Sequence, residues 1–523
     1  MRSTFAQSMA WLHTWGGLVF AWALFAIFAT GALAVFDREI TYWMTPELHG
    51  VGTAPDAAAA DAAHAWLARH AAGADRWNVA LPDAREPAIR VNWRPPTEPG
   101  APRPRFERRF LDPATGEAVD ARTTQGGGFF FRFHFSLDLA RTGIWIVGAA
   151  AIAMLAALVS GVVIHRRIFR DMFTFRPVAA AQRAWLDAHN ASGVLLLPFH
   201  FMIAFTGLVI FWGIYLPAGI TTAFDGDRRA FNATSSPPLA ERAPSGIAAP
   251  LLPLGDALTR AEHEFGADQV RSLNVVAPGD AAAVIHATRR VDDRLRLAGD
   301  RVAFDGVTGA VLDRRTEYAP VAHLQRVMAG LHFAQFGGAP MRWLYFLAAT
   351  GGAVMFATGL VLFAVKRRHR HAESATAARA YRFADAMTVA GVAGLLAAGA
   401  AYLWANRLLP ATLDGREVWE VRAFYGVWAL ALGHAMLRGG GARAWAEQLA
   451  VAGGLCLLLP VVNALTATHH LGATLAAGDW RLAGVDLTAL ALGLGLLWPA
   501  RRAGRHGRVT MPAVPGAIPA RPA

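Results

Sequence analysis

The stretch AWLHTWGGLVFAWALFAIFATGALAVF, residues 10–36, decides the architecture, because no charged residue occurs between Trp11 and Phe36. An apolar run of this length crosses about 30 Å of hydrocarbon as a helix, and it exceeds the apolar core of a cleaved signal peptide. We therefore expect a retained membrane-spanning helix over residues 8–36.

The rest of the chain has the composition of a membrane protein, with 54% hydrophobic and only 17% charged residues among 523. Its single cysteine, Cys456, excludes a disulfide framework, a Cys-ligated zinc site and a thiolate-held iron–sulfur cluster. We predict an all-α polytopic membrane protein with about eight transmembrane helices. The seven further spans are expected near residues 141–165, 187–217, 341–366, 384–405, 421–437, 447–467 and 482–500, the last four forming a C-terminal transmembrane block at 384–500.

Arginines set the predicted orientation. They cluster beside the apolar runs, in HRRIFR (165–170), VKRRHRH (365–371) and ARRAGRHGR (500–508), and account for much of the net charge of +12. By the positive-inside rule these segments face the cytoplasm, which places both termini and the tail 501–523 there. No basic face is interleaved with base-stacking aromatics, so we expect a lipid bilayer and no nucleic acid as the partner.

Two long polar segments, 37–140 and 218–340, then lie in the periplasm of a bacterial inner membrane. Each has a helical stretch followed by strand-like runs, and each ends in a tight turn, at Thr115-Gly116 and Thr308-Gly309. We expect a small α+β module that occurs twice.

The apolar spans repeat as well. An offset of 176 residues lays the first span on the third and pairs His13 with His189. An offset of 198 residues lays the second span on the fourth and pairs His134 with His332. We therefore predict that the first four spans form a duplicated bundle with a pseudo-twofold axis along the membrane normal.

A polar ring in or beside hydrocarbon needs a partner, so these four histidines are candidate functional residues. Two imidazoles opposed across a four-helix core are what a bis-histidine haem requires. Each histidine on its own could instead have a purely structural role, as a hydrogen-bond partner of a carbonyl or a lipid headgroup. Glycines near them would leave room for a macrocycle, although ordinary helix packing uses small residues too. These candidates are Gly16, Gly17, Gly31, Gly161, Gly193, Gly207 and Gly359.

Two further histidines are secondary candidates. His200 lies 11 residues beyond His189 and pairs with Leu24 in the repeat, so it is an alternative ligand, part of a path between two haems, or an interhelical hydrogen-bond partner. His165 ends the second span and is a candidate for a headgroup or haem propionate. A metal-transport site is the competing use of such histidines, but the repeated spans hold no Asp or Glu in their interiors.

The chain resembles the PepSY-associated transmembrane family over about residues 5–370. The resemblance is carried by the repeated order of WLHTWGGLVFAW, FHFSLDL, AHNASGVLLLPF and LHFAQFGG, interrupted by two modules that look like PepSY domains. Members include inner-membrane ferric-siderophore reductases with two b-type haems. The resemblance implies one haem b on His13 and His189 at the cytoplasmic side, and a second on His134 and His332 at the periplasmic side.

The implied function is electron transfer across the membrane to a ferric siderophore or other iron chelate, with release of iron during uptake. No strand is followed by a G-x-G-x-x-G fingerprint, so a quinol or a separate cytoplasmic reductase must donate the electrons. A membrane-anchored PepSY regulatory or binding protein and a siderophore-iron permease are the alternatives. The block 384–500 departs from a minimal family member and is a candidate docking surface, quinol site or fused partner.

Overall fold

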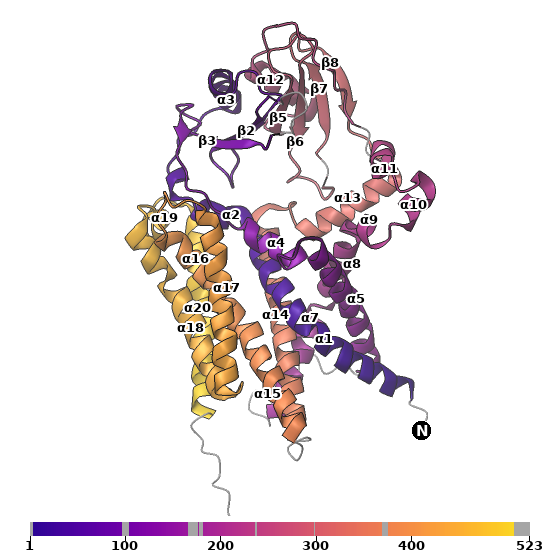
Figure 1. Ribbon diagram of the computed structural model, residues 1–523, viewed down its shortest axis with the longest axis vertical. Coiled ribbons are helices and arrows are strands. Elements are labelled where there is room, and N and C mark those ends of the chain that lie inside the picture. Colours follow the sequence, from indigo (N-terminus) through magenta and orange to yellow (C-terminus); the bar gives the residue numbers. More distant parts are fainter. Residues whose placement is uncertain are drawn as a thin grey trace, which may run out of the picture.

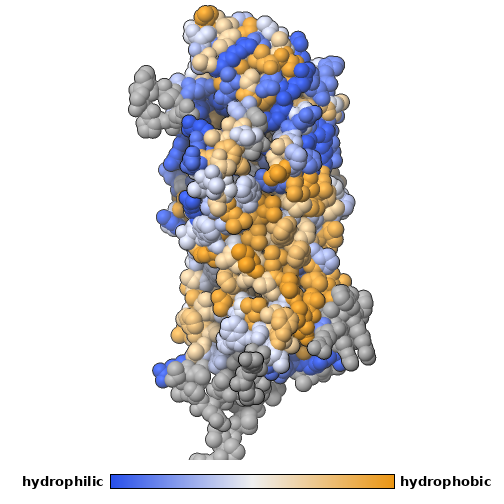
Figure 2. Space-filling model, turned by 90° about the vertical axis from the view of Figure 1, so that its right-hand side faces the viewer, coloured by the Kyte–Doolittle hydropathy of each residue, from blue (hydrophilic) through white to orange (hydrophobic). Residues whose placement is uncertain are grey.

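The computed structural model describes residues 4–96, 104–165, 176, 181–235, 238–297, 299–368 and 375–506. Figure 1 shows long helices side by side in the lower part and an antiparallel sheet above them. In Figure 2 an apolar surface covers the helices between a more hydrophilic upper part and a hydrophilic lower end. This distribution is that of a multi-pass membrane protein with one domain outside the bilayer.

Six helical segments within the described residues are long and apolar enough to cross a membrane. In one of them a π-helical turn, η2, joins two α-helices into a continuous segment. The segments are α1 (Phe5–Ala34), α5 (Ala140–Ile164), α14 (Gly338–Arg368), α15–η2–α16 (Ala375–Val389, Ala390–Gly394 and Leu395–Leu408), α18 (Ala442–Thr466) and α20 (Trp480–His506).

The third predicted span is not one helix. It is broken into α7 (Ala181–Leu195) and α8 (Leu197–Ile210), which are bent by 65° at Leu196. Pro198 lies in the first turn of α8. Because proline has no backbone N–H, it cannot continue the helical hydrogen bonds of α7, and it is well tolerated at the start of a new helix. The pair counts as a seventh span only if the two pieces cross the bilayer together.

The predicted span at 421–437 is a helix, α17 (Arg416–Arg438), but it is not among the six described segments that are long and apolar enough to cross a membrane. Its first two turns contain Arg416, Glu417, Glu420 and Arg422. The predicted number of eight spans is therefore not confirmed.

The eight strands form one sheet, with the order β4-β3-β2-β1-β5-β6-β7-β8, and every neighbouring pair is antiparallel. The strand-like runs predicted in both modules lie in it. The predicted helical stretches form α3 (Asp56–His70) and α12 (Leu254–Phe265). The strands are β1 (Arg76–Ala80), β2 (Ile89–Arg94), β3 (Glu107–Leu111), β4 (Ala118–Val119), β5 (Val270–Val276), β6 (Val284–Arg289), β7 (Arg301–Asp305) and β8 (Val311–Arg315).

The two modules are joined edge to edge. β1 pairs with β5, and Asn78 lies opposite Asn274 at the centre of that pairing. The predicted turns between the last two strands of each module contain Gly116 and Gly309, whose φ angles of 70° and 72° favour glycine. α3 and α12 share one apolar core with the sheet. The pairing removes the edge that each module would otherwise expose.

Short helices lie where the sheet domain meets the bundle (Figure 1). Two of them, α4 and α13, each precede a long span and carry His134 and His332. The set is α2 (Asp37–Trp43), η1 (Pro46–Leu48), α4 (Gly128–Ser136), α9 (Trp212–Tyr215), α10 (Ala218–Phe224), α11 (Arg228–Ser235), α13 (Pro320–Phe333) and α19 (Leu471–Ala476).

The C-terminal helices pack on the first half of the bundle through aromatic rings and a buried ion pair. Phe129 of α4 contacts Tyr402 of α16 and Phe424 of α17, with ring centres 4.8 and 5.0 Å apart. The ion pair joins Arg416 and Glu420, both fully buried. Glu420 also accepts a hydrogen bond of 2.7 Å from Thr124, in the segment before α4, so the pair ties α17 to the first half of the chain.

This ion pair gives a stability prediction. Glu420→Gln leaves the Arg416 guanidinium buried without its counter-ion, so we expect the free energy of unfolding to fall by about 3–5 kcal/mol. The measurement is the thermal unfolding midpoint of the purified protein in detergent.

Glu417→Gln on the same helix is the matched control and is expected to leave the midpoint unchanged. The double variant Arg416→Met with Glu420→Met removes both charges and is expected to recover most of the loss. Equal midpoints for Glu420→Gln and Glu417→Gln would contradict the structural role of the pair.

Candidate functional site

The first predicted pair of histidines comes together between α1 and α7. The ring centres of His13 and His189 lie 6.2 Å apart, with an angle of 71° between the ring planes. His13 Nδ1 lies 2.9 Å from the carbonyl oxygen of Ala157 on α5. His189 Nδ1 lies 2.9 Å from the carbonyl oxygen of Met355 on α14. Four helices therefore fix this pair.

The second predicted pair lies near the sheet, between α4 and α13. The ring centres of His134 and His332 are 6.0 Å apart, at 38°. His134 Nδ1 lies 2.8 Å from the carbonyl oxygen of Ile27 on α1. His332 Nδ1 lies 3.0 Å from the hydroxyl of Thr206 on α8, and this histidine also bonds the backbone of Ile203.

These hydrogen bonds fix the tautomer of each ring. A carbonyl oxygen only accepts, so the Nδ1 atoms of His13, His134 and His189 carry the proton and donate it. The Thr206 hydroxyl has its own acceptor, the Met202 carbonyl oxygen at 2.7 Å, and accepts from His332. Each Nε2 is then left with a free lone pair, which is the state in which imidazole binds a metal.

The same contacts occur twice, with the offsets found in the sequence. His13 with Ala157 becomes His189 with Met355, because 13 + 176 = 189 and 157 + 198 = 355. The backbone partner of the other pair shifts from Ile27 to Ile203 in the same way, since 27 + 176 = 203. The predicted duplication stays a prediction, and these repeated contacts support it.

Glycines face all four rings, again in repeat pairs. A Cβ atom built on Gly161 or Gly359 would lie 3.2 or 3.1 Å from Cε1 of His13 or His189. A Cβ on Gly31 would lie 2.6 Å from Nδ1 of His134, and one on Gly207 3.0 Å from Cε1 of His332. A larger side chain at any of these four positions would push on a histidine ring. These glycines therefore leave room for the rings, in addition to any part they have in helix packing.

Both pairs fit the predicted haem. Metal–imidazole bonds of about 2 Å, with roughly 1 Å from Nε2 to the ring centre, put the centres of two axial rings roughly 6 Å apart. The two pairs measure 6.2 and 6.0 Å. The ring spacing, the free Nε2 atoms and the facing glycines therefore all suit bis-histidine ligation. That these residues bind haem remains a prediction.

The secondary candidates belong to neither pair. His200 is fully buried, and neither ring nitrogen has a hydrogen-bond partner among the described residues. Its ring contacts Phe28 at 5.8 Å and Phe199 at 6.1 Å, and a Cβ on Gly352 would lie 3.0 Å from its Nε2. His165 is the C-cap of α5 and lies close enough to the first pair to interact with it electrostatically.

Two histidines that neither repeat offset pairs with another histidine have other contacts. His434 Nε2 lies 2.8 Å from Glu447, and the ring of His469 packs on that of His49 at 5.5 Å. Residues 369 and 371 lie outside the described part of the chain. Sequence reasoning missed Thr206 as a partner of His332, although the repeated Thr-Gly dipeptides at 30–31 and 206–207 marked its position.

A family model described as "PepSY-associated TM region" matches residues 10–366. An uncharacterized protein of Pseudomonas aeruginosa is 27% identical over 405 residues, which cover 72% of this chain and 96% of that protein. Both histidine pairs lie inside the matched range, whereas α15 to α20 lie beyond it. The candidate site is thus in the region that matches the family.

The glycine contacts give a prediction for the second pair. Gly31→Ala places a methyl group on the His134 ring and breaks the bond of that ring to Ile27, so we expect the variant to lose one of two haem equivalents. Gly426→Ala on α17 meets nothing within 4 Å and is expected to keep both. Haem is counted by pyridine haemochrome spectra. Two haem equivalents in Gly31→Ala would refute this role of the glycine.

A second prediction separates His200 from the ligands. His200→Leu copies the repeat mate Leu24 and removes two unsatisfied buried nitrogens, each of which costs about 1–3 kcal/mol. We expect an unchanged haem content and a thermal unfolding midpoint that is equal or higher. His189→Ala is the comparison and is expected to lose one haem equivalent. Loss of haem from His200→Leu alone would assign His200 as the iron ligand.

Proposed function

The chain belongs to the family of the PepSY-associated TM region, and from that premise we propose that it is a di-haem oxidoreductase of the bacterial inner membrane. It passes electrons across the bilayer to a ferric siderophore or similar iron chelate in the periplasm. Reduction releases the iron, because hard oxygen donors hold ferrous iron far less tightly than ferric iron. The observation that carries the proposal is the pair of opposed imidazoles, found twice, with every Nε2 free.

In this proposal His13 and His189 hold one haem b, and His134 and His332 hold the second. The bound cofactor supplies one-electron chemistry. The chain itself fixes the ligands: each Nδ1–H is held by a neighbouring helix, which orients the ring and raises the basicity of Nε2.

The positions of the two pairs suit transfer across a bilayer. His13 and Ile27, the residue whose carbonyl holds His134, both lie on α1, fourteen residues apart (27 − 13). At 1.5 Å per residue this separation is about 21 Å, a large part of the hydrocarbon thickness. Between them α1 buries Ala21, Leu24 and Phe25 in the apolar core of the bundle.

The proposed topology places the sheet domain in the periplasm and both termini in the cytoplasm. Basic residues support it: Lys366 of α14 and Arg501 and Arg502 of α20 lie at the ends of helices that point away from the sheet (Figure 1). The electron donor is a quinol or a separate cytoplasmic reductase, since we found no dinucleotide-binding fingerprint in the sequence.

Haem stoichiometry tests the proposal. The purified protein is expected to be red, reducible by dithionite, and to contain two haem b per chain. His134→Ala and His332→Ala each remove an axial imidazole of the same pair and are expected to lose one equivalent.

His434→Ala is the control, because His434 pairs with Glu447 and not with another histidine. This variant is expected to keep both haems. A colourless protein after growth with added haem would overturn the proposal and favour a regulatory or binding role.

A further inference from the structure

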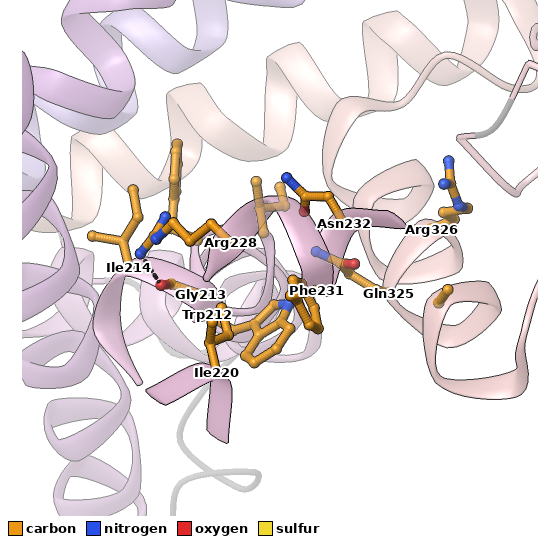
Figure 3. Close-up of a pocket in the computed structure, with 12 residues that line it drawn as sticks. Trp212, Gly213, Ile214, Ile220, Arg228, Phe231, Asn232, Gln325 and Arg326 are labelled. Carbon is orange, nitrogen blue, oxygen red and sulfur yellow. Dashed lines mark hydrogen bonds between the residues drawn. The ribbon is translucent and has the colours of Figure 1, made fainter. Parts of the chain in front are cut away.

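A pocket of about 350 Å³ lies at the end of the bundle near His332 (Figure 3). Its walls come from the end of α8, from the arm α9–α11 that follows it, and from α13. This volume lies in the range of small-molecule sites. The lining residues are Ile210, Phe211, Trp212, Gly213, Ile214, Ile220, Arg228, Phe231, Asn232, Ala322, Gln325 and Arg326.

The corresponding place in the first repeat is closed. Gly213 and Gln325 of the pocket correspond to Asp37 and Gly127, because 37 + 176 = 213 and 127 + 198 = 325. At Gly127 a Cβ atom would lie 2.1 Å from the carbonyl oxygen of Asp37, so the two backbones touch. The same two positions line an open space in the second repeat.

The C-terminal block covers the closed side. The chain after Asp37 forms α2, and Trp43 at its end is fully buried and donates a hydrogen bond of 3.1 Å to Asp486 of α20. In the second repeat the arm α9–α11 takes the position of α2. Figure 1 shows this arm on the side of the molecule opposite the C-terminal helices. Of the two equivalent positions, the one in the second repeat is therefore open.

The open pocket is cationic and aromatic. Arg228 and Arg326 line it, and its twelve described lining residues include no carboxylate. The Arg326 guanidinium lies over the ring of Tyr318, 4.2 Å from the ring centre, and interacts electrostatically with Asp300. Arg228 is fixed by a hydrogen bond of 2.6 Å to the Gly213 carbonyl oxygen. Burial lowers the pKa of Arg326 from its ordinary value, but a guanidinium stays charged at neutral pH. Figure 3 shows the amides of Asn232 and Gln325 reaching into the space between α11 and α13.

The pocket is close to the second histidine pair. Gln325 precedes His332 by seven residues on α13, about 10 Å of helix. Phe211 at the pocket contacts Phe135, the residue after His134, with ring centres 5.9 Å apart. Ile210 lies one turn beyond Gly207, the glycine that faces His332. A ligand in the pocket would thus lie within a few side chains of the pair.

We propose that this pocket binds the electron acceptor and that the acceptor is an anionic ferric chelate. This inference rests on the proposed function, because it names the substrate class of that reaction. The two guanidinium groups attract the negative charge, and Trp212 and Phe231 contact the apolar or aromatic parts of the chelate. One electron reduces iron(III) to iron(II) in the chelate, and the quinol or reductase supplies it. No bond of the protein forms or breaks.

Binding is tested first without electron transfer. Gallium(III)-EDTA is a redox-inert anion that mimics ferric EDTA, and its dissociation constant is measured by calorimetry. Arg228→Gln with Arg326→Gln is expected to weaken binding by about tenfold or more. Arg229→Gln with Arg242→Gln makes the same change in charge at two arginines outside the lining, and is expected to change binding by less than about twofold. Equal weakening in both double variants would overturn the proposal.

The second arm measures how fast the dithionite-reduced protein is reoxidised. Ferric EDTA is anionic and hexaammineruthenium(III) is cationic. The pocket variant is expected to lose about tenfold in rate with ferric EDTA and none with the ruthenium complex. Unchanged rates with both oxidants would overturn the proposal that the pocket binds the acceptor, but not the proposed function. Lack of haem, or reoxidation by neither, would overturn the proposed function, while gallium(III)-EDTA binding still reports on the pocket.

A lipid headgroup is the competing anion for two arginines at a membrane interface. If the pocket variant lost bound phosphatidylglycerol, counted as lipid phosphorus after purification, and kept its affinity for gallium(III)-EDTA, the pocket would be a lipid site and the proposal would be overturned. Retained phosphatidylglycerol with weakened gallium(III)-EDTA binding supports the chelate.

Discussion

Each of the four imidazole rings in the bundle forms a hydrogen bond from its Nδ1 atom to a neighbouring helix, and this constraint organises the site. A ring buried in an apolar core must satisfy its N–H, and a backbone carbonyl of the adjacent helix or a threonine that is already donating provides the acceptor. The bond sets the tautomer, leaves Nε2 basic, and fixes which helices must be neighbours. Helix packing and ligand chemistry therefore depend on the same contacts.

Much of this arrangement was predictable from the sequence. Apolar runs located six of the described membrane-spanning segments, and strand-like runs located the described strands, because both signals are local in the sequence. The two offsets predicted the histidine pairing, since a repeated fold repeats its contacts. The pairing of β1 with β5 was not predictable, because the sequence of an edge strand does not determine which other strand it pairs with. The break before Pro198 was missed because a long apolar run looks the same whether straight or bent.

The C-terminal helices show what sequence periodicity leaves out. The apolar stretch at 421–437 predicted a span. In the structure the charged start of α17 is buried, where Arg416 and Glu420 form an ion pair, while Leu430 and Leu437 further along are exposed. Such a pair specifies one docking geometry, because its hydrogen bonds reach Thr124 and Asn406 at fixed distances. Hydropathy measures the average along a segment, so it does not show that the polar groups at one end of a helix pair inside the protein.

The two halves of the bundle differ in three ways. Leu24 of the first half corresponds to the buried His200 of the second, and the backbone contact of Gly127 with Asp37 corresponds to the pocket at Gln325 and Gly213. The C-terminal block packs on the first half. The contact of Gly127 with Asp37 closes this position in the first half, while the corresponding position in the second half lines a pocket with polar groups.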